Sequence, residues 1–200
     1  MSVAVTAALM MFACPAIAAQ ARFPDIPREQ MTEAQQRVYD AIASGPRGAV
    51  RGPFGPLLRS PELADRVQKL GEYLRYNSSL PPRLSELAIL INARVWGAKY
   101  EWAAHRPTAI AGGLAATVVD ELGRNRRPGG LKPDEQLVYD FCMTLHRTHN
   151  VDDALYRRAI DALGERGVID LVAINGYYTM VSMVLNVAEI PIPEGASSPW

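Results

Sequence analysis

Apolar residues recur every three or four positions along most of the chain, a spacing that places them on one face of an α-helix. Thr32 is a residue type that favours helix N-termini, and the pattern behind it continues through Val38 and Ile42. Ser60-Pro61-Glu62 predicts the start of a second helix. Later helices are predicted after Pro82, from about Ala98 to Ile110, through Tyr139, through Ala159 and Leu163, and from Val168 to Val187. The chain is therefore predicted to be all-α.

The helix predicted after Leu80-Pro81-Pro82 is apolar on almost every side, and Gly97 ends it. Its apolar positions are Leu87, Ile89, Leu90, Ile91 and Val95. A helix without a polar face is a buried helix, so this segment is expected at the centre of the fold.

Two segments are predicted to be loops. Residues 44–56 contain four glycines and three prolines, and residues 125–130 are polar and rich in glycine and proline. The first loop is long enough to be a binding loop or lid, although a plain connector is the default interpretation.

Two short motifs recur along the chain. Gln36-Arg37-Val38-Tyr39-Asp40 returns one hundred positions later as Gln136-Leu137-Val138-Tyr139-Asp140. Leu84-Ser85-Glu86-Leu87-Ala88-Ile89 has an echo in Val168-Ile169-Asp170-Leu171-Val172-Ala173. Chance similarity between amphipathic helices is the alternative, but we interpret the pattern as two related helical halves.

The first 21 residues differ from the rest of the chain. They contain no charged side chain, run apolar from Val3 to Ala13, and offer small residues for cleavage at Ala16-Ile17-Ala18 and Ala19-Gln20-Ala21. The apolar run is shorter than the roughly 20 residues that span a bilayer. We therefore predict a signal peptide over 1–21, a helical domain over 22–200, and an exported protein, periplasmic or secreted, with no stable membrane anchor after cleavage.

Composition narrows the possible partners. The chain has 21 Lys and Arg and 21 Asp and Glu, so its formal net charge is zero and no overall electrostatic attraction to nucleic acid is expected. With 48% hydrophobic residues, it can bury a sizeable core. Cleavage would remove Cys14 and leave Cys142 as the only thiol, which excludes an internal disulfide.

Three residues carry the candidate chemistry. Glu101 and His105 are four positions apart, so they share one face of a helix, and Glu86 begins the preceding helix. If the two helices are antiparallel, two carboxylates and an imidazole meet in one pocket and could transfer protons. Trp96, Tyr100 and Trp102 would form apolar walls, and Arg83 or Arg94 would hold an anionic substrate group. On spacing alone, a surface or interhelix contact is the favoured interpretation of the Glu-His pair.

Residues 80–90, Tyr100-Glu101-Trp102-Ala103-Ala104-His105 and Ala111-Gly112-Gly113-Leu114 together resemble the carboxymuconolactone decarboxylase family, which includes the alkylhydroperoxidase D proteins. The signature of the latter is a helical Glu, a Cys-x-x-Cys pair and a His four residues after the second Cys. Glu86 and His105 match that Glu and His. Ala98 and Glu101 stand where the two cysteines are expected, so a thiol peroxidase mechanism is not predicted.

The resemblance implies an alkylhydroperoxidase D-like helical bundle that assembles into trimers or hexamers. It also implies a lyase or isomerase that needs no cofactor or metal and acts on a small carboxylated lactone or organic acid. In that mechanism His105 would be the general acid, Glu101 would orient it, and Glu86 would tune or relay the proton. The alternatives are a non-catalytic small-molecule-binding or stress-related protein on the same fold, and a peroxidase that uses Cys142.

Overall fold

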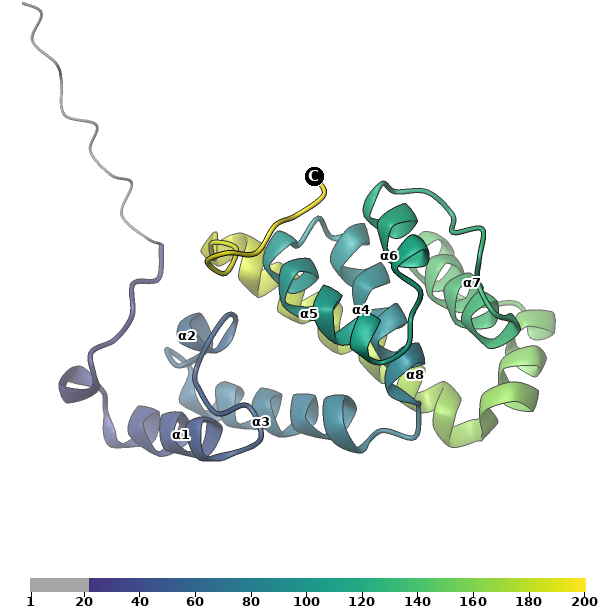
Figure 1. Ribbon diagram of the computed structural model, residues 1–200. Helices are drawn as coiled ribbons and strands as arrows, with labels where there is room; N and C mark the ends of the chain where they lie inside the picture. The colour runs from purple at the N-terminus through teal and green to yellow at the C-terminus, as the bar shows by residue number, and fades with distance from the viewer. Residues whose placement is uncertain (1–21) are drawn as a thin grey trace, which may run out of the picture.

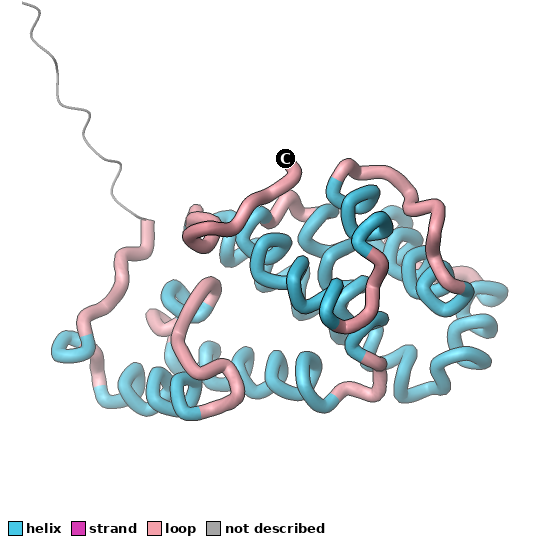
Figure 2. The backbone as a smooth tube through the Cα atoms, in the orientation of Figure 1, coloured by secondary structure: helices cyan, strands magenta, loops and turns pink. Residues whose placement is uncertain are grey.

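The computed structural model describes residues 22–200, and over this range the chain forms helices and loops without a strand (Figure 2). The predicted signal peptide lies outside the described residues. The all-α prediction is confirmed. In chain order the α-helices are α1 (Glu33–Ser44), α2 (Phe54–Leu57), α3 (Pro61–Glu72), α4 (Pro82–Val95), α5 (Lys99–Ala111), α6 (Ala116–Gly123), α7 (Pro133–Thr148) and α8 (Asp153–Ala188). A 3₁₀ turn, η1 (Arg28–Gln30), precedes α1, and a π-helical turn, η2 (Tyr73–Asn77), extends α3.

Local sequence signals set most helix ends. The Thr32 hydroxyl accepts a hydrogen bond from the backbone N–H of Gln35, whose side chain accepts one from the backbone of Thr32. Gly97 follows α4 with φ +60°, a left-handed conformation that a glycine adopts without a steric penalty. The predicted start of α3 at Pro61 is correct, although the Ser60 side chain makes no capping hydrogen bond.

The structure differs from the predicted elements in three places. The helix α6 lies in a segment for which no helix was predicted. The short helix α2 begins inside the segment predicted to be a loop. The two helices predicted near the C-terminus run together as α8, with a break at Gly164 (φ +70°, ψ 171°). Because this backbone conformation lies outside the helical region, α8 changes direction at Gly164 while its helical turns continue on both sides.

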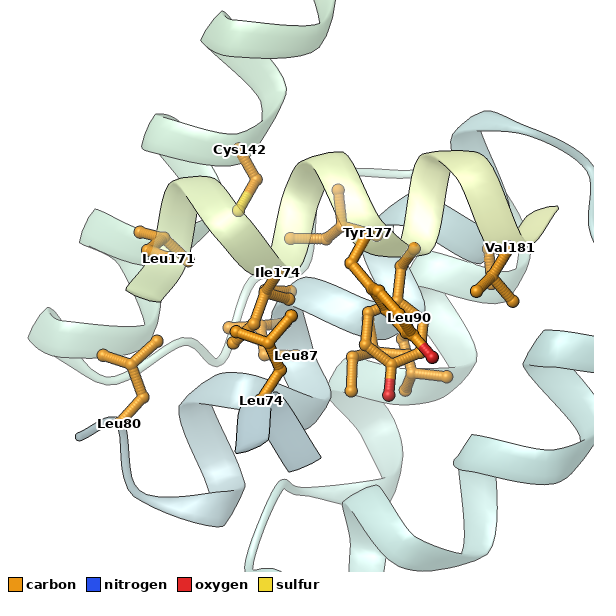
Figure 3. Close-up of a cluster of buried hydrophobic side chains, with 14 of the residues drawn as sticks. Leu74, Leu80, Leu87, Leu90, Cys142, Leu171, Ile174, Tyr177 and Val181 are labelled. Carbon is orange, nitrogen blue, oxygen red and sulfur yellow. The ribbon is translucent and has the colours of Figure 1, made fainter. Parts of the chain in front are cut away.

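The core is built around α4, which packs against α5, α7 and α8 (Figure 1). Every residue of α4 from Leu84 to Ala93 is buried, as its apolar sequence predicts. From α8, the side chains of Leu171, Ile174 and Tyr177 enter the same core (Figure 3). α8 is also long and apolar enough to cross a membrane. However, 56% of its apolar 18-residue window is buried inside the protein, as in a core helix.

The two related halves predicted from the sequence are visible in matching interactions. In the first half, Arg28 lies over the Tyr39 ring and pairs with Asp40 at 2.7 Å. In the second half, Arg127 lies over the Tyr139 ring and pairs with Asp140, also at 2.7 Å. The other recurring motif has one carboxylate in each half, and these two residues, Glu86 and Asp170, are both buried. The repetition therefore extends from sequence to contacts.

Candidate active site

α4 and α5 together place two carboxylates against one imidazole. The turn at Gly97 reverses the chain, so that α5 returns along α4 and forms the most extensive helix pair of the fold. Glu86 lies in the second turn of α4, and His105 lies near the middle of α5. Glu101 is one helical turn before His105 on the same helix, so its side chain reaches the same ring.

The His105 ring is held at both nitrogens. Nδ1 lies 2.7 Å from Oε2 of Glu86, and Nε2 lies 3.0 Å from Oε1 of Glu101. His105 is 3% exposed and each glutamate 4%. The Tyr178 ring packs edge-on against the imidazole, with 5.3 Å between the ring centroids. A protonated imidazole donates from both nitrogens, so this arrangement suits the imidazolium form.

The surroundings of His105 change its acidity. Burial by itself lowers the pKa of His105, but the negative charges of Glu86 and Glu101, together with their hydrogen bonds, outweigh burial and raise the pKa to about 9. Burial, and then the charge of Glu101, raises the pKa of Tyr178 above its usual value. At neutral pH the site is therefore a buried carboxylate, imidazolium and carboxylate beside a neutral phenol.

One side of this triad faces a cavity of about 490 Å³. Glu101 and His105 belong to the cavity wall, whereas Glu86 is not among the lining residues and lies behind the ring. Tyr177, Tyr178 and Val181 from α8 line it as well. The cavity is in the size range of small-molecule sites, so a ligand in it would contact Glu101 and His105 before Glu86.

Three arginines line the same cavity. Arg47 and Arg51 come from the loop between α1 and α2, and Arg75 comes from η2. None of the three forms an ion pair with any residue from 22 to 200. An unpaired guanidinium beside a concave site favours an anion, above all a carboxylate that it can bind with two hydrogen bonds.

Two glycines allow these arginines to reach the cavity. At Gly52 (φ +59°), a β-carbon would lie 2.6 Å from the Tyr100 ring, so the loop rests directly on that ring. At Gly71 in α3, a β-carbon would overlap the Tyr177 hydroxyl group and lie 2.6 Å from Nη2 of Arg47. Arg47 also lies over the Phe54 ring, 4.6 Å from its centroid. The glycine-rich loop is thus packed onto the cavity wall.

Only one of the five residues that were expected to bind substrate lines the cavity. Tyr100 lines it. Arg83 instead forms ion pairs with Asp134 at 2.7 Å and Glu135 at 2.5 Å, which join the start of α4 to the start of α7. Its charge is already neutralised there, and it does not line the cavity.

Arg94 and the two tryptophans also lie elsewhere. Arg94 lies over the Trp200 ring, 4.6 Å from its centroid. Trp96 donates a hydrogen bond from Nε1 to the Thr179 hydroxyl, and Trp102 packs edge-on against Trp200. None of the three lines the cavity. Trp102 follows Glu101 directly, so on a helix its side chain points about 100° away from the carboxylate.

Cys142 is separated from this chemistry. Its thiol is fully buried in the core (Figure 3), and it accepts a hydrogen bond from Nδ2 of Asn175 at 3.2 Å. Burial raises the pKa of Cys142 to about 12, so the thiol stays protonated and unreactive at neutral pH. It is not among the lining residues of the cavity that contains His105. Between residues 22 and 200, no group of three His, Cys, Asp or Glu side chains is arranged to hold a metal ion.

Comparison with known proteins agrees with the fold and with the sequence resemblance. Residues 61–138 match the model of the carboxymuconolactone decarboxylase family, and this segment contains Glu86, Glu101 and His105. No curated protein matches the chain. The expected resemblance to the carboxymuconolactone decarboxylase and alkylhydroperoxidase D-like superfamily is confirmed.

Two solved structures share the fold. One is the alkylhydroperoxidase AhpD core of an uncharacterized peroxidase-related protein from Ralstonia eutropha JMP134, with a TM-score of 0.70 and 17% identity over 88% of this chain and 95% of that chain. The other is an uncharacterized peroxidase-related protein from Silicibacter sp. TM1040, with a TM-score of 0.66 and 15% identity over 89% of this chain and 95% of that chain. At these identities the similarity establishes the alkylhydroperoxidase D-like fold.

Proposed function

We propose that this protein is a cofactor-independent lyase of the decarboxylase type, or an isomerase, that acts on a small carboxylated lactone or organic acid. The observation that carries the proposal is the pairing of His105 with Glu101 at the wall of a cavity that also contains three unpaired arginines. The buried acid and base groups supply proton transfer, and the arginines supply attraction for an anion.

The arginines support a carboxylated substrate. With His105 protonated, Glu86, His105 and Glu101 together carry one negative charge, which the cavity arginines outweigh. In the proposed complex Arg47, Arg51 or Arg75 binds a substrate carboxylate, in place of Arg83 and Arg94. Tyr100 and Tyr177 provide flat walls for a ring-shaped molecule.

The hydrogen bonds of His105 suggest a route for the proton. Loss of carbon dioxide breaks a carbon–carbon bond, and its electron pair moves into a conjugated carbonyl group. A proton must then be added to carbon. Because both nitrogens of His105 are held by carboxylates, Glu101 takes the proton from Nε2 of the imidazolium and passes it to the substrate carbon, and the neutral ring then regains a proton from water. Glu86 keeps the His105 ring in position and stabilises its positive charge. This order exchanges the roles expected for Glu101 and His105 from the sequence.

The test is a screen of the purified protein against muconolactone-type acids, with loss of substrate and release of carbon dioxide as readouts. We expect turnover that falls by roughly 10²-fold or more in His105→Ala. Equal turnover by both proteins would remove His105 from the mechanism.

A second pair of measurements separates the alternatives. Cys142→Ser is expected to keep full turnover, and neither protein is expected to reduce an organic hydroperoxide in the presence of a dithiol. Peroxide reduction that depends on Cys142 would replace the proposal with the peroxidase interpretation. Binding of these acids without turnover, weakened by Arg47→Gln, would instead identify a non-catalytic binding protein.

A further inference from the structure

Tyr178 on α8 packs against the group that can exchange protons. Its ring meets the His105 ring edge-on, with 5.3 Å between the centroids and 85° between the planes. The Tyr177 ring also packs edge-on against it, with 5.1 Å between the centroids. Only 3% of Tyr178 is exposed, and the residue lines the cavity. These contacts hold the phenol ring in one position beside the triad.

The hydroxyl group of Tyr178 is unused within the part of the chain that the structure describes. It forms no hydrogen bond with any residue from 22 to 200. It is not completely enclosed either, so it opens into the cavity that Tyr178 lines. Buried tyrosine hydroxyls usually have a hydrogen-bond partner. An O–H group that lacks one and faces a cavity is available to a ligand that offers an acceptor.

Four tyrosines line the cavity, and Tyr178 is the one whose ring packs against His105. Its neighbour Tyr177 already has a polar contact. A β-carbon at Gly71 would touch both the Tyr177 hydroxyl and Nη2 of Arg47, so these two groups lie side by side. The hydroxyl that is both open and next to the triad is therefore that of Tyr178.

Negative charge on a ligand beside the triad needs a neutral or positive donor. With His105 protonated, the triad carries one negative charge and repels an oxyanion. Both nitrogens of His105 are held by carboxylates, so the ring has no N–H left for a carbonyl oxygen. Burial, and then the charge of Glu101, raises the pKa of Tyr178 well above its usual value, so the phenol keeps its proton at neutral pH.

We propose, as a step that rests on the function proposed above, that the Tyr178 hydroxyl donates a hydrogen bond to the conjugated carbonyl oxygen of the substrate. When the carbon–carbon bond to the carboxyl group breaks, carbon dioxide leaves and the electron pair places a negative charge on this oxygen. Tyr178 stabilises that charge and keeps its own proton. Glu101 then passes its proton to carbon, the carbonyl double bond forms again, and Tyr178 is unchanged. The substrate must therefore carry a conjugated carbonyl group in addition to its carboxylate.

A binding measurement tests the proposal without turnover. The probe is 4-hydroxy-3-nitrobenzoate, which at pH 8 carries a carboxylate for the cavity arginines and an ionised phenol oxygen in place of the substrate oxyanion. The reference ligand, 3-nitrobenzoate, is the same molecule without that oxygen. Tyr178→Phe keeps the ring against His105 and removes the hydroxyl. We expect it to weaken binding of the probe at least about tenfold, because a hydrogen bond to a charged oxygen is lost, and to change binding of the reference ligand less than about twofold.

Tyr139→Phe is the matched control. Tyr139 is a buried tyrosine of α7 that does not line the cavity, so loss of its hydroxyl should leave the affinity for both ligands unchanged. Circular dichroism verifies that both variants are folded. Equal losses for the two ligands in Tyr178→Phe would assign Tyr178 a merely structural role and overturn the proposal. Wild-type and Tyr178→Phe proteins that bind the probe equally well, or not at all, would overturn it as well.

Turnover separates this role from the proposed function. On a substrate found in the screen, Tyr178→Phe is expected to lower kcat by roughly 10²-fold and to leave KM within about threefold, because the donor acts when charge develops. Full turnover in Tyr178→Phe would refute the role of Tyr178 and leave the lyase proposal standing. Selective loss of probe binding in Tyr178→Phe, in a protein that turns over none of these acids, would refute the lyase proposal and keep Tyr178 as a donor to ligand oxyanions.

Discussion

Glu86 and Asp170 occupy corresponding positions in the two related halves, and each is a buried carboxylate. Glu86 lies 2.7 Å from His105, a group that can exchange protons and that faces a cavity. Asp170 accepts hydrogen bonds from the Tyr73 hydroxyl and from the backbone and hydroxyl of Ser79. In our proposal, the same position of the repeat serves proton transfer in one half, whereas in the other half it holds η2 and α8 together through hydrogen bonds.

Glu86 and Asp170 are buried to the same extent, so they differ in the groups that they contact. Burial tends to raise the pKa of Asp170, but the hydrogen bonds from Ser79 and Tyr73 hold that pKa below its usual range. These donors fix a permanent negative charge between η2 and α8. Glu86 faces an imidazole that is itself held by Glu101, so the proton can move within the group. We therefore expect a catalytic role for Glu86, whose partner can titrate, and a structural role for Asp170.

The largest expected effect is on turnover. Glu86→Gln removes the charge behind His105, and we expect kcat to fall by roughly 10² to 10³-fold. Asp170→Asn makes the same change at the corresponding position and should leave kcat within about threefold of the wild type, since Asp170 does not line the cavity. Steady-state kinetics on a substrate found in the screen measures both. Similar losses in the two variants would show that the halves do not differ in the way described.

The next effect concerns stability at alkaline pH. The pKa of His105 is raised from 6.5 to about 9 in the folded protein, so protonated His105 stabilises the fold fully below pH 6.5. This contribution is lost as the pH rises through 9, and the loss is on the order of 3 kcal/mol. Urea unfolding from pH 6 to pH 10 measures it. Asp170→Asn should keep the pH dependence and His105→Gln should abolish it. A flat profile in the wild type would contradict the imidazolium assignment.

A smaller effect is expected on stability at neutral pH. Asp170→Asn replaces one of the two accepting oxygens by a donor, so either the two Ser79 donors or the Tyr73 hydroxyl lose their acceptor, and we expect a loss of about 2 kcal/mol in the free energy of unfolding. Because the pKa of Asp170 is lowered in the folded protein, its charge stabilises the fold above pH 3.8 and this contribution fades as the pH falls. The variant should therefore lose part of the acid sensitivity of the wild type. Unchanged stability would mean that the hydrogen bonds of Asp170 do not stabilise the fold.

The smallest effect tests the repeat at the surface. Arg28→Gln and Arg127→Gln each remove an ion pair and a contact with a tyrosine ring at equivalent places. Both arginines are more than half exposed, so solvent screens each pair and each change is expected to lower stability only slightly. Thermal unfolding measures the two variants side by side. A loss as large as that of Asp170→Asn in either variant would show that the pair does more than cover the surface.

The helices and the triad could be predicted from the sequence because their signals are local. Thr32 and Gly97 mark helix ends through their own side chain or backbone, and the four-residue spacing of Glu101 and His105 fixes their shared face. Glu86 required one further assumption, an antiparallel pair of helices. The fold satisfies it because the Gly97 turn is short.

The arginines that line the cavity could not be predicted in the same way. Arg83 was a reasonable anion site by position, but its partners Asp134 and Glu135 are about fifty residues away in the chain. Arg47 and Arg75 reach the cavity through a loop and a helix end whose packing no periodic pattern encodes. The only signal was the glycine content of residues 44–56, which indicated a possible binding loop without indicating what it would bind.

The most direct test of the account is an NMR titration of the His105 ring, since the proposed chemistry depends on a buried imidazolium between two carboxylates. The chain has three histidines, and His105→Gln identifies the resonance. We predict a titration with a pKa near 9 in the wild type and in Asp170→Asn, and a lower pKa in Glu86→Gln. A pKa at or below 6.5 in the wild type would contradict the central claim.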